Sequence, residues 1–108
     1  MTNSMKIGIF GSNNDSTVDG VLAEVKAAER DDFASYWQSQ IFGLDALSTL
    51  SVVGHQVPRI ELGTSVIPTY PRHPMMLAQQ ALTANQASGG RLCLGIGLSH
   101  RSEEHTSE

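Results

Sequence analysis

Short apolar runs alternate along this chain with longer segments whose apolar residues recur at helical spacing. The apolar runs predict strands at residues 6–10, 33–37, 60–66 and 92–96, and we expect the first of these strands to be buried. The intervening segments predict helices beginning near Thr17, Asp45 and Pro74, since Thr and Asp are common N-caps and proline suits the first helical turn. The predicted order is βαβαβαβ, and its short connections favour an α/β fold of four parallel strands with right-handed crossovers.

Glycine and proline residues indicate where several of these elements end. We expect Gly54 to end the second helix and Gly89 and Gly90 to end the third, because glycine adopts the left-handed conformation that often follows a helix. Pro68 and Pro71 prevent the third strand from continuing as an interior strand. The third helix has a predicted apolar face made of Leu77, Ala78, Ala81, Leu82 and Ala84.

Two architectures accept this order of elements: an open doubly wound sheet and one half of an eight-stranded barrel. A dinucleotide-binding open sheet would carry Gly-x-Gly-x-x-Gly after the first strand, and the glycines of residues 8–13 do not have that spacing. In both architectures ligands bind at the carboxyl ends of the strands, where polar residues gather in this sequence at 11–13, 38–40, 69–73 and 97–100. Arg59 and Arg91 fall at the opposite end, where we expect them to serve stability.

The composition and charge of the chain exclude several classes of protein. The chain has 108 residues, a net charge of −4 and scattered Lys and Arg residues, which gives no electrostatic footprint for nucleic acid or an anionic membrane. The single cysteine, Cys93, excludes an internal disulfide, and its place in a strand predicts a small buried side chain. There is no apolar stretch long enough to span a membrane and no signal pattern, so we expect a cytoplasmic protein.

The titratable residues offer few candidates for chemistry. No pair of carboxylates is placed for acid–base work, and the histidines lack the spacing of metal ligands, so no metal site is predicted. His55 is expected to be exposed. His73, next to Pro74, is compatible either with orienting the start of a helix or with a functional role, whereas His100 follows a strand end at the presumed ligand face.

Two motifs carry a resemblance to a known family. Residues 62–74 read LGTSVIPTYPRHP, and residues 89–97 read GGRLCLGIG. Together they resemble the amino-terminal half of the luciferase-like monooxygenase superfamily, the bacterial-luciferase-like flavin and deazaflavin oxidoreductases, most closely the type that uses coenzyme F-420. The resemblance runs from about Lys6 to His100 and implies the first half of a (β/α)8 TIM barrel.

The resemblance also implies a cofactor, a reaction and a site. The cofactor would be the deazaflavin F-420, with FMN as the alternative. The reaction would be hydride transfer to or from a small organic substrate, or monooxygenation with FMN. A cis peptide bond between Ser65 and Val66 would support the cofactor ring at the end of the third strand. Pro68, Thr69 and Gly97 would help form the ring pocket.

Two positions depart from the F-420-dependent sugar-phosphate dehydrogenases of this superfamily. Gln40 stands where those enzymes have a histidine, and His100 stands where they have a glutamate. Glutamine can hydrogen-bond to the cofactor ring or the substrate but cannot shuttle a proton. His100 is therefore the candidate catalytic acid. Because of these two differences, we do not infer a sugar-phosphate substrate for this chain.

The resemblance divides the chain into three parts. Residues 1–5 form an extension, residues 6–100 form a truncated barrel domain, and residues 101–108 match one reading frame of a sequencing adapter, which predicts a non-native tail. Since a (β/α)8 barrel needs about 250 residues, we expect this chain to be inactive by itself and the full-length protein to be a homodimer. The alternative is a non-catalytic flavin-binding or dimerisation module of the same fold.

Overall fold

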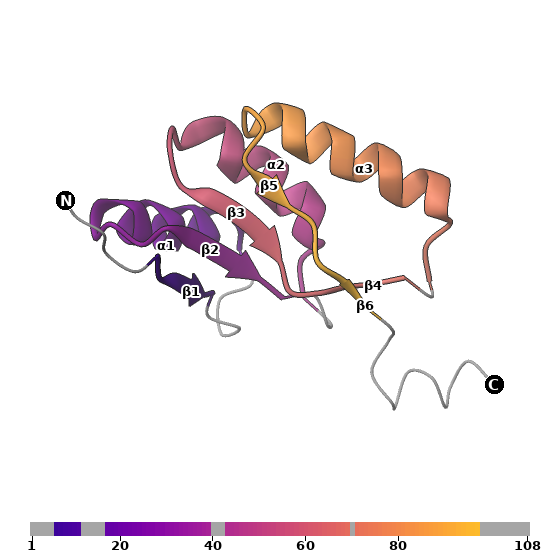
Figure 1. Ribbon diagram of the computed structural model, residues 1–108, viewed down its shortest axis with the longest axis horizontal. Coiled ribbons are helices and arrows are strands. Elements are labelled where there is room, and N and C mark those ends of the chain that lie inside the picture. The colour runs from indigo at the N-terminus through magenta and orange to yellow at the C-terminus, as the bar shows by residue number, and fades with distance from the viewer. Residues whose placement is uncertain (1–5, 12–16, 40–42, 70, 98–108) are drawn as a thin grey trace.

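The computed structural model describes residues 6–11, 17–39, 43–69 and 71–97, and it forms an α/β fold (Figure 1). The first half contains β1 (Gly8–Phe10), α1 (Val18–Arg30), β2 (Ser35–Gln38) and α2 (Ala46–Gln56). The second half contains β3 (Glu61–Thr64), β4 (Ile67–Pro68), α3 (Pro74–Ala87), β5 (Leu92–Cys93) and β6 (Ile96–Gly97). Gln40, His100 and the expected terminal segments 1–5 and 101–108 lie outside the described residues.

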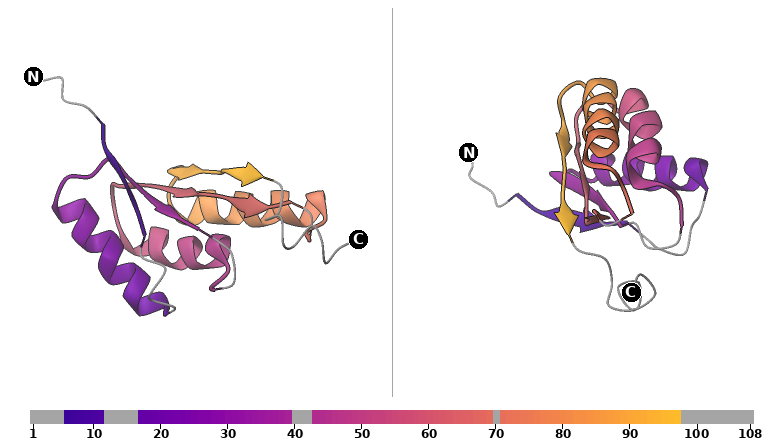
Figure 2. Two further views of the ribbon diagram at one scale, coloured as in Figure 1. Left: turned by 90° about the horizontal axis from the view of Figure 1, so that it is seen from below. Right: turned by 90° about the vertical axis from the view of Figure 1, so that its right-hand side faces the viewer.

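The strands form a parallel sheet with all three helices on one face (Figure 2). The main sheet has the order β1-β2-β3-β5, and β4 pairs with β6 in a short second sheet. Every pair is parallel, which confirms the βαβαβαβ prediction. We call the face turned away from the helices the open face. Within the part of the chain that the structure describes, no helix is both long and apolar enough to cross a membrane.

The helices begin where the sequence predicts, because each start is fixed by local hydrogen bonds. Thr17 Oγ1 accepts a hydrogen bond from the Gly20 amide at 3.0 Å, and Asp45 Oδ2 accepts one from the Ser48 amide at 2.9 Å. Pro74 occupies the first turn of α3. At the far end of α3, Gly89 has a positive φ of 66°, which confirms the expected glycine stop.

Gly54 does not end α2 as predicted, since the helix continues to Gln56. The reason lies in packing rather than in backbone conformation. A Cβ on Gly54 would lie 2.7 Å from Ser88 Cβ and 3.0 Å from Leu62 Cδ1. The missing side chain lets α2 approach β3 and the end of α3 closely.

The core lies between the sheet and the helices. Its larger cluster joins α1, β2, α2 and β3 through Val25, Tyr36, Leu50 and Leu62, among others. A second cluster joins α2, β4 and α3 and comprises Ala46, Leu47, Ile67, Leu77 and Ala84.

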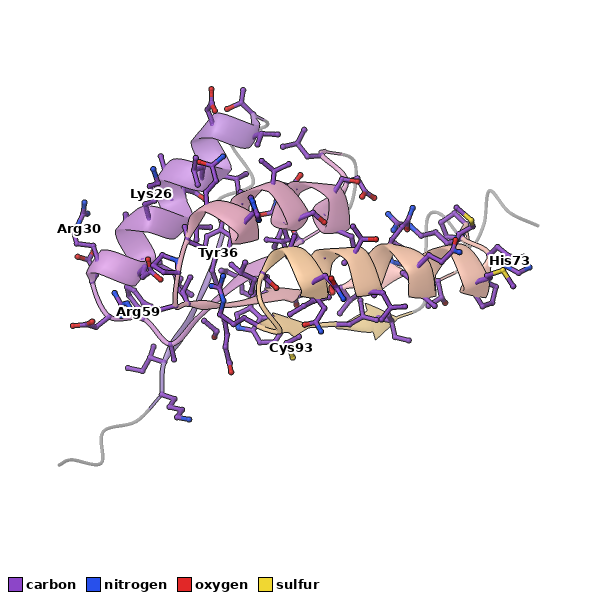
Figure 3. The ribbon with its side chains drawn as sticks, turned by 90° about the horizontal axis from the view of Figure 1, so that it is seen from above. Lys26, Arg30, Tyr36, Arg59, His73 and Cys93 are labelled. Atoms are coloured by element: carbon purple, nitrogen blue, oxygen red, sulfur yellow. The ribbon has the colours of Figure 1, made fainter. Side chains whose placement is uncertain are left out.

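Three burial predictions are wrong because they concern the edges of this half-barrel. The expected first strand is mostly exposed, with Phe10 at 64 %, because β1 pairs only with β2 among the described residues. Cys93 is exposed rather than buried, because it lies on the open face of β5 (Figure 3). On α3, Leu77 and Ala84 are buried as expected, whereas Ala78 and Leu82 are exposed.

The third and fourth expected strands are each interrupted. β3 ends at Thr64 and the chain resumes pairing as β4, while β5 ends at Cys93 and pairing resumes as β6. Pro68 lies within β4, in register with Gly97. It is tolerated there because the amides on either side of it, from Ile67 and Thr69, are the ones that donate to the neighbouring strand, at the Gly95 and Gly97 carbonyls.

Candidate functional site

The interruptions of the two strands lie side by side at the carboxyl end of the sheet. Before them, Gly63 is in register with Cys93. After them, Ile67 is in register with Ile96. Three residues of one strand, 64–66, therefore oppose only two of the other, 94–95. This one-residue excess is a β-bulge, which commonly re-aims side chains near functional sites.

The bulge changes which side chains reach the open face. A one-residue shift of register reverses the faces that successive side chains occupy. Ile67 thus becomes fully buried beneath the helices, while Val66 remains 42 % exposed. The Val66 side chain lies against Gly95 and Gly97. A Cβ atom added to Gly95 would be 3.5 Å from one Val66 methyl group, and one added to Gly97 would be 3.1 Å from the other. The peptide bond between Ser65 and Val66 is cis, as the resemblance implied.

Thr64 connects the two strands at the bulge. Its fully buried hydroxyl accepts a hydrogen bond from the Gly95 amide at 2.8 Å and donates one to the Gly95 carbonyl at 2.8 Å. A Cβ on Gly95 would overlap the Thr64 carbonyl oxygen. Position 95 therefore requires glycine because another backbone approaches it closely.

Beyond the bulge, the chain is tied to β6. The Thr69 amide donates to the Gly97 carbonyl at 3.0 Å, and the Thr69 hydroxyl donates to the same oxygen at 3.3 Å. Pro68 is buried beside them. Val66, Pro68, Thr69 and Gly97 therefore belong to one small region, bounded on the open face by apolar and backbone groups.

An indole lies on the open face beside this region. Trp37 donates from Nε1 to Ser35 Oγ at 2.8 Å, which orients its ring along β2. A Cβ on Gly63 would overlap the indole, and one on Gly8 would lie 2.9 Å from Nε1. The two glycines thus make room for one large aromatic side chain across three strands. In a closed barrel this face is the interior.

An ion pair anchors the segment that leads from β4 into α3. Arg72 pairs with Asp45, the N-cap of α2, and donates to Gln80 Oε1 at 2.7 Å. Burial alone would raise the pKa of Asp45, but hydrogen bonds from Ser48 and the positive charge of Arg72 outweigh it, so this pKa is lowered. Asp45 is therefore held as a carboxylate.

The opposite end of the sheet is closed by charged side chains that bind backbone. The Arg91 guanidinium donates to the carbonyls of Ser88, Ile60, Gly54 and Val57 at 2.6–2.9 Å. Glu29 accepts from the amides of Arg59 and Ile60 at 2.6 Å and 2.9 Å. Arg91 has the structural environment that the sequence predicted. Arg59 and His73 lie at opposite ends of the molecule (Figure 3).

The structure brings together five of the seven predicted site residues: Ser65, Val66, Pro68, Thr69 and Gly97. Gln40 and His100 lie outside the described residues, so their roles stay predictions. His73 serves as the N-cap of α3, its Nδ1 accepting from the Met75 amide at 3.1 Å. Among the described residues, no group of three His, Cys, Asp or Glu side chains is placed to hold a metal.

Sequence reasoning missed Thr64 and Arg72 at this site. Thr64 stands inside the quoted 62–74 motif, but its role depends on a partner 31 residues away. Arg72 stands in the same motif, and Asp45 was identified only as a helix cap. The signal was present in both cases, as a polar residue beside the strand end, but its hydrogen-bond partner could not be identified from the sequence.

Comparisons with known proteins agree on one family. The family model for luciferase-like monooxygenases matches residues 5–108. A coenzyme F-420-dependent oxidoreductase of Mycobacterium tuberculosis is 41 % identical over 75 residues, which cover 69 % of this chain and 22 % of that protein.

Solved structures show the same fold. The F-420-dependent tetrahydromethanopterin reductase of Methanopyrus kandleri superposes with a TM-score of 0.84 at 23 % identity, covering 97 % of this chain and 30 % of that one. A Baeyer–Villiger monooxygenase component from Pseudomonas putida, in complex with FMN, gives 0.82 at 18 % identity, covering 97 % and 33 %. The chain thus spans less than a third of the length of the Mycobacterium relative and about a third of these structures.

Proposed function

Because the chain belongs to the luciferase-like monooxygenase family, we propose that it forms the cofactor-binding part of an oxidoreductase barrel that transfers hydride between coenzyme F-420 and a small organic substrate. The observation that carries the proposal is the bulge at residues 64–66, which places Val66 on the open face beside Gly95 and Gly97. A flat ring needs a surface of this kind: apolar, free of long side chains and at the carboxyl end of the strands.

The residues present fit a flavin or deazaflavin ring. Gly95 and Gly97 carry no side chains, so the Val66 methyl groups can lie against the backbone at these positions. Val66 supplies an apolar contact, and Pro68 and Thr69 border it. When bound, F-420 would supply two-electron hydride chemistry. This chain would orient the ring and exclude water beneath it, while Gln40 would hydrogen-bond to ring or substrate and His100 would donate a proton.

F-420 is the preferred cofactor, with FMN as the alternative. The relative that is 41 % identical is named as F-420-dependent. The FMN-bound monooxygenase component shares the fold at 18 % identity, which supports the possibility of a flavin without favouring it. If FMN is bound, monooxygenation replaces hydride transfer as the proposed reaction.

Activity is proposed for a complete barrel rather than for these 108 residues alone. The described residues supply four strand positions of a barrel that has eight, and the phosphate-binding loops of such barrels typically follow the later strands. We therefore expect this chain to bind either cofactor weakly, if at all, and to show no turnover.

Oligomerisation is proposed on a separate observation. The sequence of α3 contains no Asp, Glu, Lys or Arg, yet it exposes Met75, Met76 and Leu82. An uncharged helix with exposed large apolar side chains is typical of an interface. This supports a homodimer of the complete protein, and it also supports the alternative, a non-catalytic flavin-binding or dimerisation module.

The test uses two variants matched for exposure. Val66 is 42 % exposed at the bulge and Val52 is 47 % exposed on α2. We expect Val66→Asp to weaken F-420 binding at least about tenfold in a fluorescence titration, because a buried carboxylate would face the ring. Val52→Asp, the control on α2, should leave the affinity for F-420 unchanged.

The same pair of variants is then placed in a chimeric barrel. Residues 6–97 of this chain replace the matching segment of the Mycobacterium relative, and turnover is measured with F-420 and with FMN. A folded chimera that binds neither cofactor contradicts the proposed function. Binding without turnover favours the non-catalytic module.

A further inference from the structure

Arg72 joins two helices at the carboxyl end of the sheet. One terminal nitrogen of its guanidinium pairs with the Asp45 carboxylate at the start of α2, and the other donates to Gln80 of α3 at 2.7 Å. Its side chain is only 13 % exposed, compared with 34 % for Asp45. A guanidinium this shielded from water forms stronger hydrogen bonds than one on the surface.

Arg72 is also joined to the strand that follows the bulge. Its amide donates to the Thr69 carbonyl at 3.2 Å, and the Thr69 amide donates to the Gly97 carbonyl at 3.0 Å. A continuous series of hydrogen bonds therefore runs from β6 through Thr69 and Arg72 to Asp45. The segment from Pro68 to Arg72 is fixed at one end by β6 and at the other by α2 and α3.

We infer that Arg72 is a positioning residue, which holds Pro68 and Thr69 against β6 so that they form the side of the cofactor pocket. The inference rests on the proposed function, since it assigns these residues to that pocket. The planar guanidinium binds two separate acceptors at once, which a lysine ammonium does less well because it is a compact point charge. The arrangement therefore calls for arginine rather than for any cation.

The test measures amide hydrogen exchange in the full 108-residue chain, by NMR and without cofactor. The Thr69 amide reports on the segment that Arg72 holds, and the Ser65 amide, which donates to Gln38, reports on the strand before the bulge. We expect Arg72→Met to raise exchange at Thr69 about tenfold relative to Ser65, because the segment opens locally. Arg72→Lys should restore part of this protection.

Two controls separate positioning from general stability. Asp45→Asn keeps an N-cap residue for α2 but removes the charge, so it should raise exchange at Thr69 in the same direction as Arg72→Met. Arg91→Met destabilises the other end of the sheet and should not raise the ratio of Thr69 to Ser65 exchange. If that ratio stays constant in every Arg72 variant, the positioning role is wrong.

Cofactor titration is the second measurement. If the wild-type chain binds F-420 or FMN, Arg72→Met should weaken that binding about tenfold, as expected when a supporting contact of a site is lost. Unchanged affinity in the Met variant would contradict the inference. If the wild-type chain binds neither cofactor, the same titration is made in the chimeric barrel. A folded wild-type chimera that binds neither cofactor contradicts the proposed function, while the exchange ratio still decides whether Arg72 positions Thr69.

Discussion

The two ends of one parallel sheet use their polar groups in opposite ways. At the amino ends of the strands, Arg91 and Glu29 bind six backbone groups of α2 and of the connections that lead into β3 and β5. At the carboxyl ends, glycines and a bulge leave Val66 partly exposed. The side chains at the amino end satisfy backbone hydrogen-bonding groups, whereas the bulge at the carboxyl end leaves an apolar side chain partly accessible. The groups that close the backbone and the candidate site thus lie at opposite ends of the strands, which is the usual arrangement in barrels of this type.

The largest expected effect is at the amino end. Arg91→Met removes the donor of four backbone carbonyls. We expect a loss of about 3 kcal/mol in the free energy of unfolding, because partly buried carbonyls are left without partners. Urea denaturation followed by circular dichroism measures it. Arg59→Met, an exposed arginine at the same end, should change stability by less than about 0.5 kcal/mol. Equal effects of the two changes would contradict the role given to Arg91.

A smaller effect is expected at the carboxyl end. Gly95→Ala places a Cβ against the backbone carbonyl of Thr64, which cannot move without disturbing β3. We expect a loss of about 2 kcal/mol together with weaker cofactor binding. Gly97→Ala meets a Val66 methyl group at 3.1 Å, and that partly exposed side chain can shift.

Thermal unfolding of the two alanine variants makes the comparison direct. The Gly97 variant should stay within about 0.5 kcal/mol of the wild type. A tolerated Gly95→Ala would show that the two strands do not approach each other as closely at the bulge as the structure indicates.

The smallest effect depends on pH. The pKa of Asp45 is lowered in the folded protein, so its carboxylate stabilises the fold above the unfolded value of about 4 and this contribution is lost as the pH falls through the folded value. Asp45→Asn should therefore cost less than about 1 kcal/mol at pH 7, and the difference from wild type should shrink below pH 4. Urea denaturation from pH 7 to pH 3 measures it. A difference that grows as the pH falls would reverse the assigned sign.

Much of the fold could be predicted from the sequence because its signals act over a few residues. Thr17, Asp45 and Pro74 mark helix starts through hydrogen bonds or backbone constraints within one turn. Gly89 ends α3 through its own φ angle. Gly54 is also a glycine, but it does not end its helix. It allows close packing, because Leu62 and Ser88 lie where its side chain would be.

The sequence indicated the place of the candidate site and several of its residues, but not its geometry. The motif at 62–74 pointed to Ser65, Val66, Pro68 and Thr69, and the structure brings them together with Gly97. The bulge was not predicted, since apolar runs of this length are typical of continuous strands. The role of Arg72 was missed because it depends on Asp45, 27 residues away at the start of α2.

The sequence by itself determined the order of the elements, the starts of the helices and the end of the sheet at which the polar strand-end residues gather. Those features follow from backbone preferences and from the parallel topology that short βα connections impose. Only the tertiary structure decided that Cys93 is exposed, that residues 64–66 oppose 94–95, and that Arg91 binds carbonyls up to 37 residues away. These depend on which strands are neighbours and in what register, and pairing between distant segments is a property of the assembled sheet.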